Sequence, residues 1–256
     1  MIPHALSGLT FVERFYTFPS VASTNDFARA LTHVPKTGMY CIQADRQTAG
    51  RGRRGGGYFS DAAGGLWASL VVPVADIANH FTYNRAVSLA ILMTLSQCGK
   101  DLPITIKWPN DIYWGKQKIC GILLESHPGF SNVIVIGFGL NVNIAAADFP
   151  PELAGIATSV LIETGRTCAL TAVLRTILKQ FDVISTADVA KVHEAYCSRL
   201  FGRGRRISIN GIEGVYESVA ENGMLQLSVN GALIPVSTGS PVFLPEMPVA
   251  GADHAS

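Results

Sequence analysis

The chain has 256 residues, 48% of them hydrophobic and 15% charged, and a formal net charge of +1 at pH 7. This composition can bury a sizeable core and excludes a generally disordered chain. The near-neutral charge excludes the global basic bias of non-specific nucleic-acid binders. The five cysteines are widely spaced and form no C-x-x-C pair, which argues against a disulfide framework or a zinc site and favours free thiols in a reducing compartment.

The N-terminal residues lack the charged and apolar regions of a secretory signal. The most apolar segment, 86–98, is too short to span a membrane and is interrupted by hydroxyl side chains. The sequence therefore predicts a soluble, cytoplasmic protein without membrane contact.

Strand-like and helix-like patterns alternate through the first 200 residues. Strands are expected at 11–18, 39–44, 66–72, 104–108, 111–114, 119–125 and 133–142, with a hairpin turn at 115–117. Helices are expected after Ser23, which can cap the first of them, and at 82–98, 170–184 and 187–200. The segment 46–63 is rich in Gly and Arg without apolar periodicity, and we expect a loop there.

The pattern changes near residue 201, where four or five short strands follow one another. Asn-Gly pairs at 210–211, 222–223 and 230–231 separate them and are strong hairpin signals. We therefore expect an α+β fold with a first domain at 1–200, a small β-barrel or sandwich at 201–246 and a flexible tail at 247–256.

The loop between the second and third strands has the composition of an anion-binding segment. It runs from Gln47 to Tyr58 and contains Gly-Arg-Gly-Arg-Arg-Gly at 50–55. Glycines let the backbone approach a ligand, and arginines bind phosphate or carboxylate with two parallel hydrogen bonds. A flexible linker or an RGG-like nucleic-acid tail has a similar composition, but tails seldom lie between two strands of one domain.

Two lysines lie at strand ends further along the chain. Lys107 opens Lys-Trp-Pro-Asn-Asp at 107–111, where it could bind a phosphate and Asp111 could hold Mg²⁺. Lys118 begins an almost wholly apolar strand, where it could neutralise a bound carboxylate. An ordinary turn at 107–111 and a solvated strand-edge lysine at 118 are the alternatives.

The strand at 133–142 ends in Gly-Phe-Gly-Leu-Asn at 137–141, followed by Val142 and Asn143. Two glycines in a core strand indicate a bulge or the close approach of a ligand. Asn141 and Asn143 should point to one face, where two amides could bind a heterocycle. The alternative is a strand that simply ends in turn-forming residues.

In this order the segments closely resemble the biotin protein ligase family. The matching pieces are Ser-Thr-Asn at 23–25, Gln47 with 50–55, 107–111, Lys118 with Cys-Gly-Ile-Leu at 120–123, and 137–141. The resemblance covers roughly residues 12–185, and the β domain fits the family's C-terminal barrel. It implies a mixed β-sheet backed by helices, the class II synthetase-like biotin/lipoate ligase fold, with a small C-terminal β-barrel.

The resemblance also implies the reaction. The biotin carboxylate attacks the α-phosphate of ATP to give biotinyl-5′-AMP and pyrophosphate, with Mg²⁺, and a lysine of a biotin carboxyl carrier protein then attacks the acyl carbon. The biotin contacts that it implies are Ser23, Thr24, Asn25, Gln47, Gly50, Arg51, Gly121 and Leu123. The nucleotide contacts that it implies are Arg53, Arg54, Tyr58, Lys107, Asn110 and Asn141. Lys118, Arg53 and Lys107 are the implied catalytic residues, and Asp111 is the implied metal ligand. We expect an exposed strand near 133–142 that could pair with a second subunit or with the carrier protein, and monomer and homodimer both stay open.

The loop departs from the family at two positions. Many bacterial members carry Arg and Trp where this chain has Gly56 and Tyr58, which predicts looser retention of the adenylate, with Tyr58 still able to stack on adenine. Only about ten residues precede the first strand, so we expect no helix-turn-helix domain, no DNA binding and no repressor function.

Two other functions are compatible with parts of this pattern. A lipoate or octanoate ligase or transferase would share the fold, but those families lack the combination of 50–55 and 107–111. A phosphate- or RNA-binding module could use Arg46, Arg51, Arg53 and Arg54, but the net charge is nearly neutral and the loop has few aromatic residues.

Overall fold

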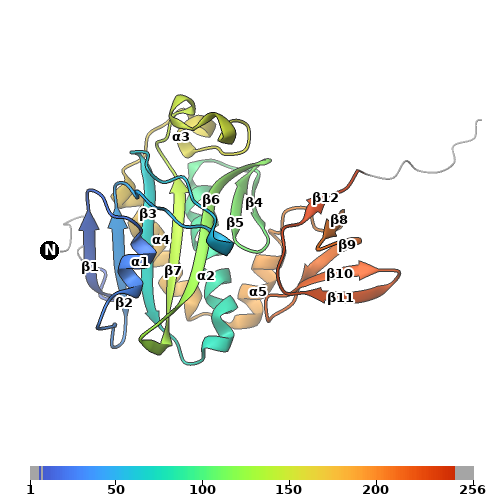
Figure 1. The fold of residues 1–256 in the computed structure, drawn as a ribbon, viewed down its shortest axis with the longest axis horizontal. Helices are drawn as coiled ribbons and strands as arrows, with labels where there is room; N and C mark the ends of the chain where they lie inside the picture. The colour runs from blue at the N-terminus through green and yellow to red at the C-terminus, as the bar shows by residue number, and fades with distance from the viewer. Residues whose placement is uncertain (1–5, 7, 246–256) are drawn as a thin grey trace, which may run out of the picture.

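The computed structural model describes residues 6 and 8–245, which form a larger and a smaller β-sheet (Figure 1). The larger sheet is mixed, because β1 and β2 pair in parallel and the other neighbours pair antiparallel. Its seven strands have the order β1-β2-β3-β7-β6-β5-β4. They are β1 (Val12–Phe18), β2 (Met39–Ala44), β3 (Gly65–Pro73), β4 (Ile104–Lys107), β5 (Asp111–Trp114), β6 (Gln117–His127) and β7 (Phe130–Asn141).

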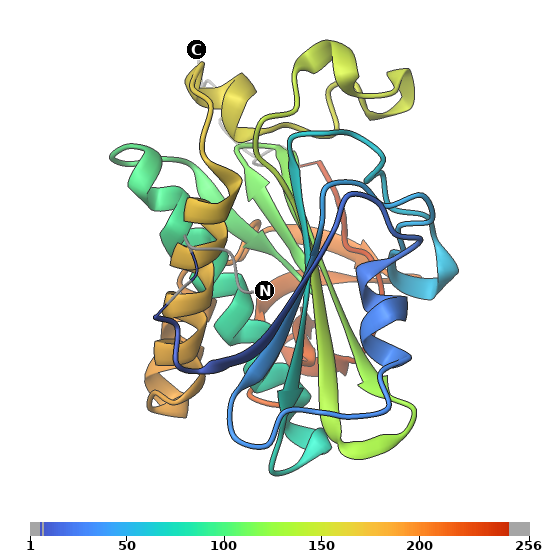
Figure 2. The same cartoon turned by 90° about the vertical axis from the view of Figure 1, so that its left-hand side faces the viewer.

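Helices cover both faces of this sheet. Figure 2 shows α2 and α4 on one face and the short α1 on the other. The α-helices are α1 (Thr24–Arg29), α2 (His80–Leu95), α3 (Val160–Thr164), α4 (Leu170–Ser185) and α5 (Val189–Cys197). Short 3₁₀ segments are η2 (Arg53–Gly55), η3 (Ile77–Asn79), η4 (Ser96–Cys98), η5 (Ala146–Asp148) and η6 (Pro151–Leu153). The predicted mixed sheet backed by helices is confirmed; α3 was not predicted.

Side-chain spacing determines how each helix is buried. In α4 the buried residues Leu174, Ile177, Leu178 and Phe181 follow the spacing of one helical face, and this face packs into the core. In α2 nearly every residue after the first turn is buried, because α4, α5 and the sheet all pack against it. The apolar run that is too short for a membrane span is therefore a central core helix. None of the described helices has the length and apolar character needed to cross a membrane.

Alternation along the strands divides the core into two layers. In β2, Met39 and Cys41 face the large cluster under α2 and α4, whereas Tyr40 and Ile42 face a smaller cluster under α1. Both faces of this strand are buried, which explains its continuous apolar pattern. All five cysteines are free, as the sequence predicts.

Strand β7 lies at the centre of the sheet. It pairs with β3 on one side and β6 on the other, so it has no free edge for a second subunit or a partner protein. The expectation of an exposed strand near 133–142 was therefore wrong. The register is also unbroken through Gly137 and Gly139, so these glycines form no bulge.

The smaller sheet is the predicted C-terminal β domain. Five antiparallel strands have the order β11-β10-β9-β8-β12, and the two end strands are not neighbours. They are β8 (Arg206–Ile209), β9 (Ile212–Val219), β10 (Leu225–Val229), β11 (Ala232–Val236) and β12 (Val242–Phe243). Asn-Gly turns with positive φ at both residues join β8 to β9 and β10 to β11, as the hairpin signals predict. The predicted tail at 247–256 lies outside the described residues, and the boundary at residue 200 stays a prediction.

The two sheets contact each other beside α2. The Trp108 indole donates to the carbonyl of Gly223 over 2.9 Å, and Phe81 packs so closely on Gly223 that a Cβ there would lie 2.5 Å from its ring. Gly223 has a φ of +88°, so it serves both the turn and the contact.

A pair of a buried arginine and a half-buried histidine beside this contact makes stability depend on pH. The Arg85 Nη1 donates to His193 Nδ1 over 2.8 Å, so His193 is neutral. Burial, and then the charge of Arg85, lowers the pKa of His193 below its usual 6.5. Between the usual pKa and the lowered pKa, the unfolded chain binds a proton at His193 that the folded chain does not. The free energy of unfolding therefore falls as the pH drops from about 7 toward the lowered pKa.

We therefore expect urea unfolding to show a lower free energy of unfolding at pH 5.5 than at pH 7.5. His193→Asn keeps an acceptor for Arg85 without titrating, and it should flatten part of that slope. His127, whose pKa burial also lowers, should contribute to the slope in the same direction. The exposed control His80→Asn should keep the wild-type slope. An unchanged slope in His193→Asn would contradict this origin of the pH dependence.

Candidate active site

A pocket of about 250 Å³ lies on the α1 side of the larger sheet. The start of α1, the Gly-Arg loop and the strands β5, β6 and β7 form its walls, and the smaller sheet contributes one residue, Ser240. The pocket is lined by Ser23, Thr24, Asn25, Gln47, Arg51, Gly52, Arg53, Gly56, Gly57, Tyr58, Ala68, Asn110, Asp111, Lys118, Gly121, Ile122, Leu123, Gly137, Phe138, Gly139 and Ser240.

Most of the residues expected in the site line this pocket, although they are far apart in the sequence. They are Ser23, Thr24, Asn25, Gln47, Arg51, Arg53, Tyr58, Asn110, Asp111, Lys118, Gly121 and Leu123. The order β3-β7-β6-β5 brings them together, because it places the loop after β2 opposite the strands that carry Lys118 and Gly121.

Four expected residues do not line it. Lys107 donates to the Tyr113 hydroxyl over 3.1 Å, and Arg54 donates to the Thr238 hydroxyl over 3.0 Å. Asn141 is buried and donates to the carbonyl of Thr158 over 2.9 Å. Gly50 of the loop packs against Ser60, and a Cβ there would come within 2.0 Å of the Ser60 hydroxyl.

Asn143, the second amide of the predicted pair, also forms hydrogen bonds to the backbone. Asn143 donates to the carbonyl of Cys168 and accepts from its N–H, each over 2.8 Å. In this structure both amides therefore anchor loops instead of facing the pocket.

One end of the pocket presents neutral hydrogen-bonding groups. Ser23 caps α1 by accepting from the Asp26 N–H, and this cap turns the next two side chains toward the sheet. The Gln47 Oε1 accepts from the Thr24 backbone N–H over 2.7 Å and lies 2.9 Å from the Thr24 hydroxyl. Because the amide oxygen is fixed in this way, the NH₂ group of Gln47 is the part of its side chain that is left for a ligand.

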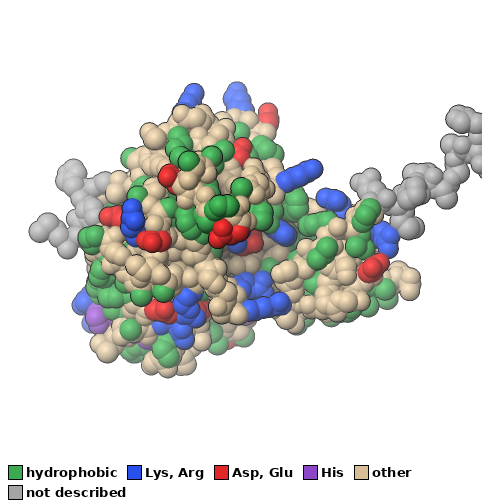
Figure 3. All heavy atoms as spheres, turned by 45° about the horizontal axis from the view of Figure 1, so that its top comes forward, with side chains coloured by type: hydrophobic (Ala, Val, Ile, Leu, Met, Phe, Trp, Pro, Cys, Tyr) green, Lys and Arg blue, Asp and Glu red, His purple; other side chains and the backbone are tan. Residues whose placement is uncertain are grey.

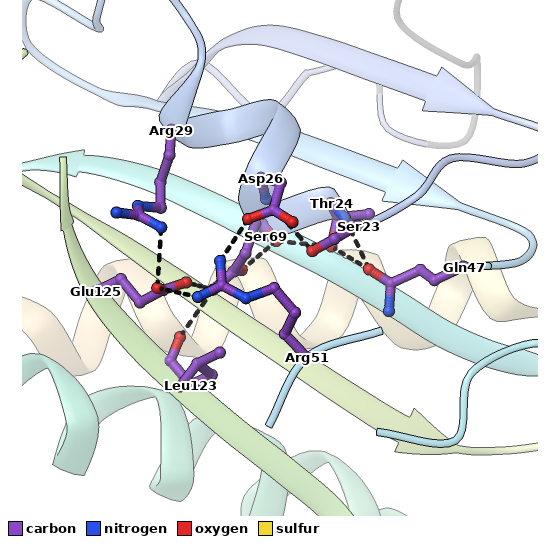
Figure 4. A network of polar contacts seen from close by, with 10 residues as sticks. Ser23, Thr24, Asp26, Arg29, Gln47, Arg51, Ser69, Leu123 and Glu125 are labelled. Atoms are coloured by element: carbon purple, nitrogen blue, oxygen red, sulfur yellow. Dashed lines mark hydrogen bonds and ion pairs between the residues drawn. The ribbon is translucent and has the colours of Figure 1, made fainter. Parts of the chain in front are cut away.

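A network of charged side chains holds the Gly-Arg loop against α1 and β6 (Figure 4). Arg51 pairs with Asp26 and also donates to the Glu125 carboxylate over 2.9 Å. Arg29 reaches the same carboxylate oxygen of Glu125 over 3.2 Å. The first arginine of the loop is therefore fixed by two carboxylates and does not project freely into the pocket.

Tyr58 forms part of the pocket floor. Its hydroxyl donates to the Gly139 carbonyl over 2.7 Å and accepts from the Gly121 N–H over 3.1 Å, so it joins β6 and β7. A Cβ at Gly121 or Gly139 would lie 2.6 or 2.4 Å from its ring, so both glycines make room for this side chain. Burial raises the pKa of Tyr58 well above 10, and the phenol stays a neutral hydrogen-bonding group.

The other end of the pocket is cationic. Lys118 forms an ion pair with Asp111 over 2.7 Å, and its ammonium lies 5.4 Å from the centre of the Tyr58 ring. Arg53 donates to Asn110 and to Thr238, each over 3.3 Å, so it bridges the two sheets. Figure 3 shows basic side chains gathered along the hollow between the larger body and the C-terminal sheet.

This cationic end fits an anion with a bound divalent metal ion better than a metal ion held by protein alone. The described residues contain no group of three His, Cys, Asp or Glu side chains that could hold a metal. Asp111 is the one carboxylate that lines the pocket. Mg²⁺ is commonly held by one or two carboxylates together with substrate phosphates, and Asp111 suits that mode.

The chemistry of the pocket follows from its two ends. A neutral polar end can bind the amide-like groups of a small heterocycle, and the glycine-rich floor can accept its apolar part. The cations at the other end can hold a carboxylate and a phosphate close together despite their mutual repulsion. The arrangement suits the joining of a carboxylic acid to a nucleotide phosphate.

Sequence reasoning did not identify several residues of the site. Glu125 and Ser69 support the neutral end, and Thr238 and Ser240 of the C-terminal sheet reach the loop and the pocket. The one signal for Glu125 is an acidic residue directly after the apolar run at 119–124. Ser69, Thr238 and Ser240 carry no signal, because any strand or turn can contain such a hydroxyl.

Comparisons with known proteins show which family the chain resembles. The profile of the biotin/lipoate A/B protein ligase family matches residues 17–141. The bifunctional ligase/repressor BirA of Bacillus spizizenii is 33% identical over 165 residues, which are 63% of this chain and 50% of that protein. The match thus spans half the length of that relative. The biotin–[acetyl-CoA-carboxylase] ligase of Paracoccus denitrificans is 30% identical over 219 residues, which are 80% of this chain and 90% of that protein.

The fold has close counterparts among solved structures. The biotin protein ligase from Aquifex aeolicus in complex with biotin and ATP superposes with a TM-score of 0.79 at 22% identity, and the alignment covers 91% of this chain and 99% of that one. The similarity of the fold, together with the extent of the match to the Paracoccus protein, leads to one assignment. The chain belongs to the biotin protein ligase family.

Proposed function

We propose that this protein activates biotin with ATP and transfers it to a lysine of a biotin carboxyl carrier domain. The observation that carries the proposal is the difference between the two ends of the pocket. One end has neutral hydrogen-bonding groups, the other end has cations, and glycines line the part between them. Biotin has the same polarity, with a ureido ring at one end and a carboxylate at the other. The names of the relatives support the same substrate and carrier.

In the first step the biotin carboxylate attacks the α-phosphate of ATP and pyrophosphate leaves. Lys118 and Arg53 would offset the charge of the two anions and hold them in line. Asp111, with the phosphates, would hold Mg²⁺, which supplies further neutralisation of phosphate charge. Asp111 also pairs with Lys118, so its carboxylate would be shared between the metal ion and this lysine.

In the second step the amine of a carrier lysine attacks the acyl carbon and AMP leaves. The acyl-adenylate hydrolyses if water reaches it, so the loop 50–58 must cover it. The ion pairs of Arg51 and the contacts of Arg53 and Arg54 with Thr238 would hold that cover in place. We place the reaction in the cytoplasm, where free thiols such as these five stay reduced.

The direct test is incubation with ATP, Mg²⁺, biotin and a biotin carboxyl carrier domain, followed by an avidin blot. Labelling of the carrier on one lysine is the expected result. Lipoate in place of biotin, with pyrophosphate exchange as the readout, tests the alternative of a lipoate or octanoate ligase. Exchange that depends on lipoate and not on biotin would overturn the proposal.

The loop arginine Arg53 gives a prediction about retention of the intermediate. Arg53→Gly removes the bonds to Asn110 and Thr238 and one phosphate contact, so biotinyl-5′-AMP should escape and label bystander lysines. We expect labelling of added albumin to rise at least about tenfold, which corresponds to the loss of about 1.4 kcal/mol of binding. Arg205→Gly, on the C-terminal sheet outside the pocket, is the control and should leave bystander labelling unchanged.

A further inference from the structure

A row of two cations and three aromatic rings crosses from the larger sheet to the smaller one. The Lys107 ammonium lies 4.9 Å from the centre of the Tyr113 ring, and the Arg205 guanidinium lies 4.9 Å from the centre of the Phe243 ring. Phe201 stands between these two rings, and its centre is 5.3 Å from that of Tyr113 and 5.2 Å from that of Phe243. We call these five residues the cation–aromatic row.

The inner end of the row lies next to the pocket. In β5, Ile112 and Trp114 are buried in the core. Asp111 and Tyr113 therefore point to the opposite face of the sheet, where Asp111 lines the pocket. Tyr113 is also the partner of Lys118 in the register of β5 and β6. The row thus begins beside the ion pair that forms the cationic end of the pocket.

The backbone fixes the part of the row that joins the two sheets. The Ile106 N–H donates to the Arg199 carbonyl over 2.8 Å, and the Phe201 N–H donates to the Ile106 carbonyl over 2.8 Å. The chain after α5 therefore runs along the outer edge of β4. Gly202 follows with a φ of +75°, and a Cβ there would lie 2.0 Å from the Phe243 ring. These contacts hold Phe201 and Phe243 against each other.

The row carries positive charge that no carboxylate neutralises. Arg205 is exposed, and Lys107 and the three rings are partly exposed. Among the ion pairs of residues 6 and 8–245, none includes Lys107 or Arg205. Basic side chains also gather along the hollow between the larger body and the C-terminal sheet (Figure 3). Such a surface attracts and orients an acidic partner.

The length of the row and the orientation of its rings select the kind of partner. Four successive contacts of 4.9–5.3 Å make the row too long for one free phosphate or carboxylate to cover. A single-stranded nucleic acid needs free ring faces on which its bases can stack. Here Lys107 and Arg205 already lie over the outer rings, and the ring planes of Phe201 and Phe243 meet at 84°. An acidic protein surface fits better, because carboxylates can reach the cations while apolar groups contact the ring edges.

We propose that the cation–aromatic row is the surface on which an acidic face of the carrier domain docks. This inference rests on the proposed function, in which the acceptor lysine has to reach the acyl carbon beside Lys118. A carrier seated on the row lies next to that position, because Tyr113 and Lys118 are neighbours across β5 and β6. Lys107, which does not line the pocket, then serves recognition of the carrier instead of binding a phosphate.

Steady-state transfer of biotin at saturating ATP and biotin tests the outer end of the row. Arg205→Glu should raise the KM for the carrier domain roughly tenfold and leave kcat unchanged, because a charge at the rim of an interface acts mainly on association. Pyrophosphate exchange with ATP needs no carrier and should keep the wild-type rate. Lys179→Glu makes the same change of charge at an exposed position on α4, which covers the opposite face of the sheet (Figure 2), and should keep the wild-type KM.

A conservative variant and the salt dependence separate charge from structure. Arg205→Lys keeps the charge and should keep a KM for the carrier close to that of the wild type. The wild-type KM for the carrier should rise with salt, and it should rise less in Arg205→Glu. An equal loss in Arg205→Lys and Arg205→Glu would mean that Arg205 is merely structural. A wild-type KM for the carrier in Arg205→Glu, or a higher KM for ATP in its place, would also overturn the proposal.

Binding of the carrier domain without ATP and biotin separates this inference from the proposed function. Titration of an isotope-labelled carrier domain with wild-type protein should broaden the NMR signals around its acceptor lysine, and Arg205→Glu should bind it roughly tenfold more weakly. If the wild type forms no biotinylated product, the proposed function fails, and this titration still decides the docking surface. Absence of binding to the wild type, equal binding to the two proteins, or Arg205-dependent binding of a single-stranded oligonucleotide in place of the carrier would overturn it.

Discussion

Lys118→Ala should lower the rate of biotin-dependent adenylate formation by roughly 100- to 1000-fold, the usual effect of removing one group that stabilises a transition-state charge. The Lys118 side chain is 29% exposed, lines the pocket and pairs with Asp111 over 2.7 Å, which would hold it where the two anions of the proposed reaction meet. In the proposed reaction it would stay beside the acyl oxygen while the phosphate bond forms.

Pyrophosphate exchange with ATP measures this step without the carrier protein. Lys116→Ala is the matched control, because Lys116 is an exposed lysine in the β5–β6 turn, two residues away and outside the pocket. Asp111→Asn distinguishes the role of Asp111 from that of Lys118. It keeps the lysine charge and should raise the Mg²⁺ concentration needed for half-maximal rate. Wild-type exchange in Lys118→Ala would remove Lys118 from the chemistry.

Local patterns were enough to predict most of the strands and helices. The strand expected at 39–44 is β2 with the same bounds, and the helix expected at 170–184 differs from α4 by one residue. These segments have a strict period or a continuous apolar run, and packing on the sheet reinforces what the sequence favours. The short α3 and the 3₁₀ segments are too brief to show a period, and the sequence did not reveal them.

The order of the strands was not predictable from local patterns. The sequence has no local signal that β7 pairs with both β3 and β6, because pairing depends on contacts between distant segments. For this reason β7 was misread as a possible exposed strand. The role of Glu125 could not be predicted for the same reason, because its partner Asn25 lies 100 residues away in the sequence.

Gly137 and Gly139 correctly indicated that another group comes close to the strand, but that group is not the one that was predicted. Gly137 and Gly139 were predicted to allow a bulge or the approach of a ligand. In the structure they make room for the protein's own side chains, Asn25 and Tyr58, which then shape the pocket. Glycine in a buried strand reports that something comes close, but the sequence does not say whether it is a ligand or a neighbouring residue.

Gly137→Ala should therefore impair biotin binding more than folding. The new Cβ would lie 2.1 Å from the Asn25 Oδ1 and 2.7 Å from its Cγ, so Asn25 has to leave its place. Ser69 and Glu125 would then each lose a hydrogen-bond partner, at about 1–2 kcal/mol apiece, beside the Thr24 side chain that lines the pocket. We expect the Kd for biotin to rise roughly 100-fold, while overpacking lowers stability by about 1–3 kcal/mol.

Titration calorimetry with biotin and thermal unfolding of the ligand-free protein check the two effects separately. Gly129→Ala is the matched control: Gly129 lies in the exposed β6–β7 turn, where a Cβ would come no closer than 3.7 Å to His127. Asn25→Ala in the Gly137→Ala background tests the cause, because it removes the side chain that collides. That double variant should recover thermal stability but not biotin affinity, because the Asn25 side chain is still missing from its place. A recovered affinity would show that the collision alone weakens binding and that biotin does not need Asn25.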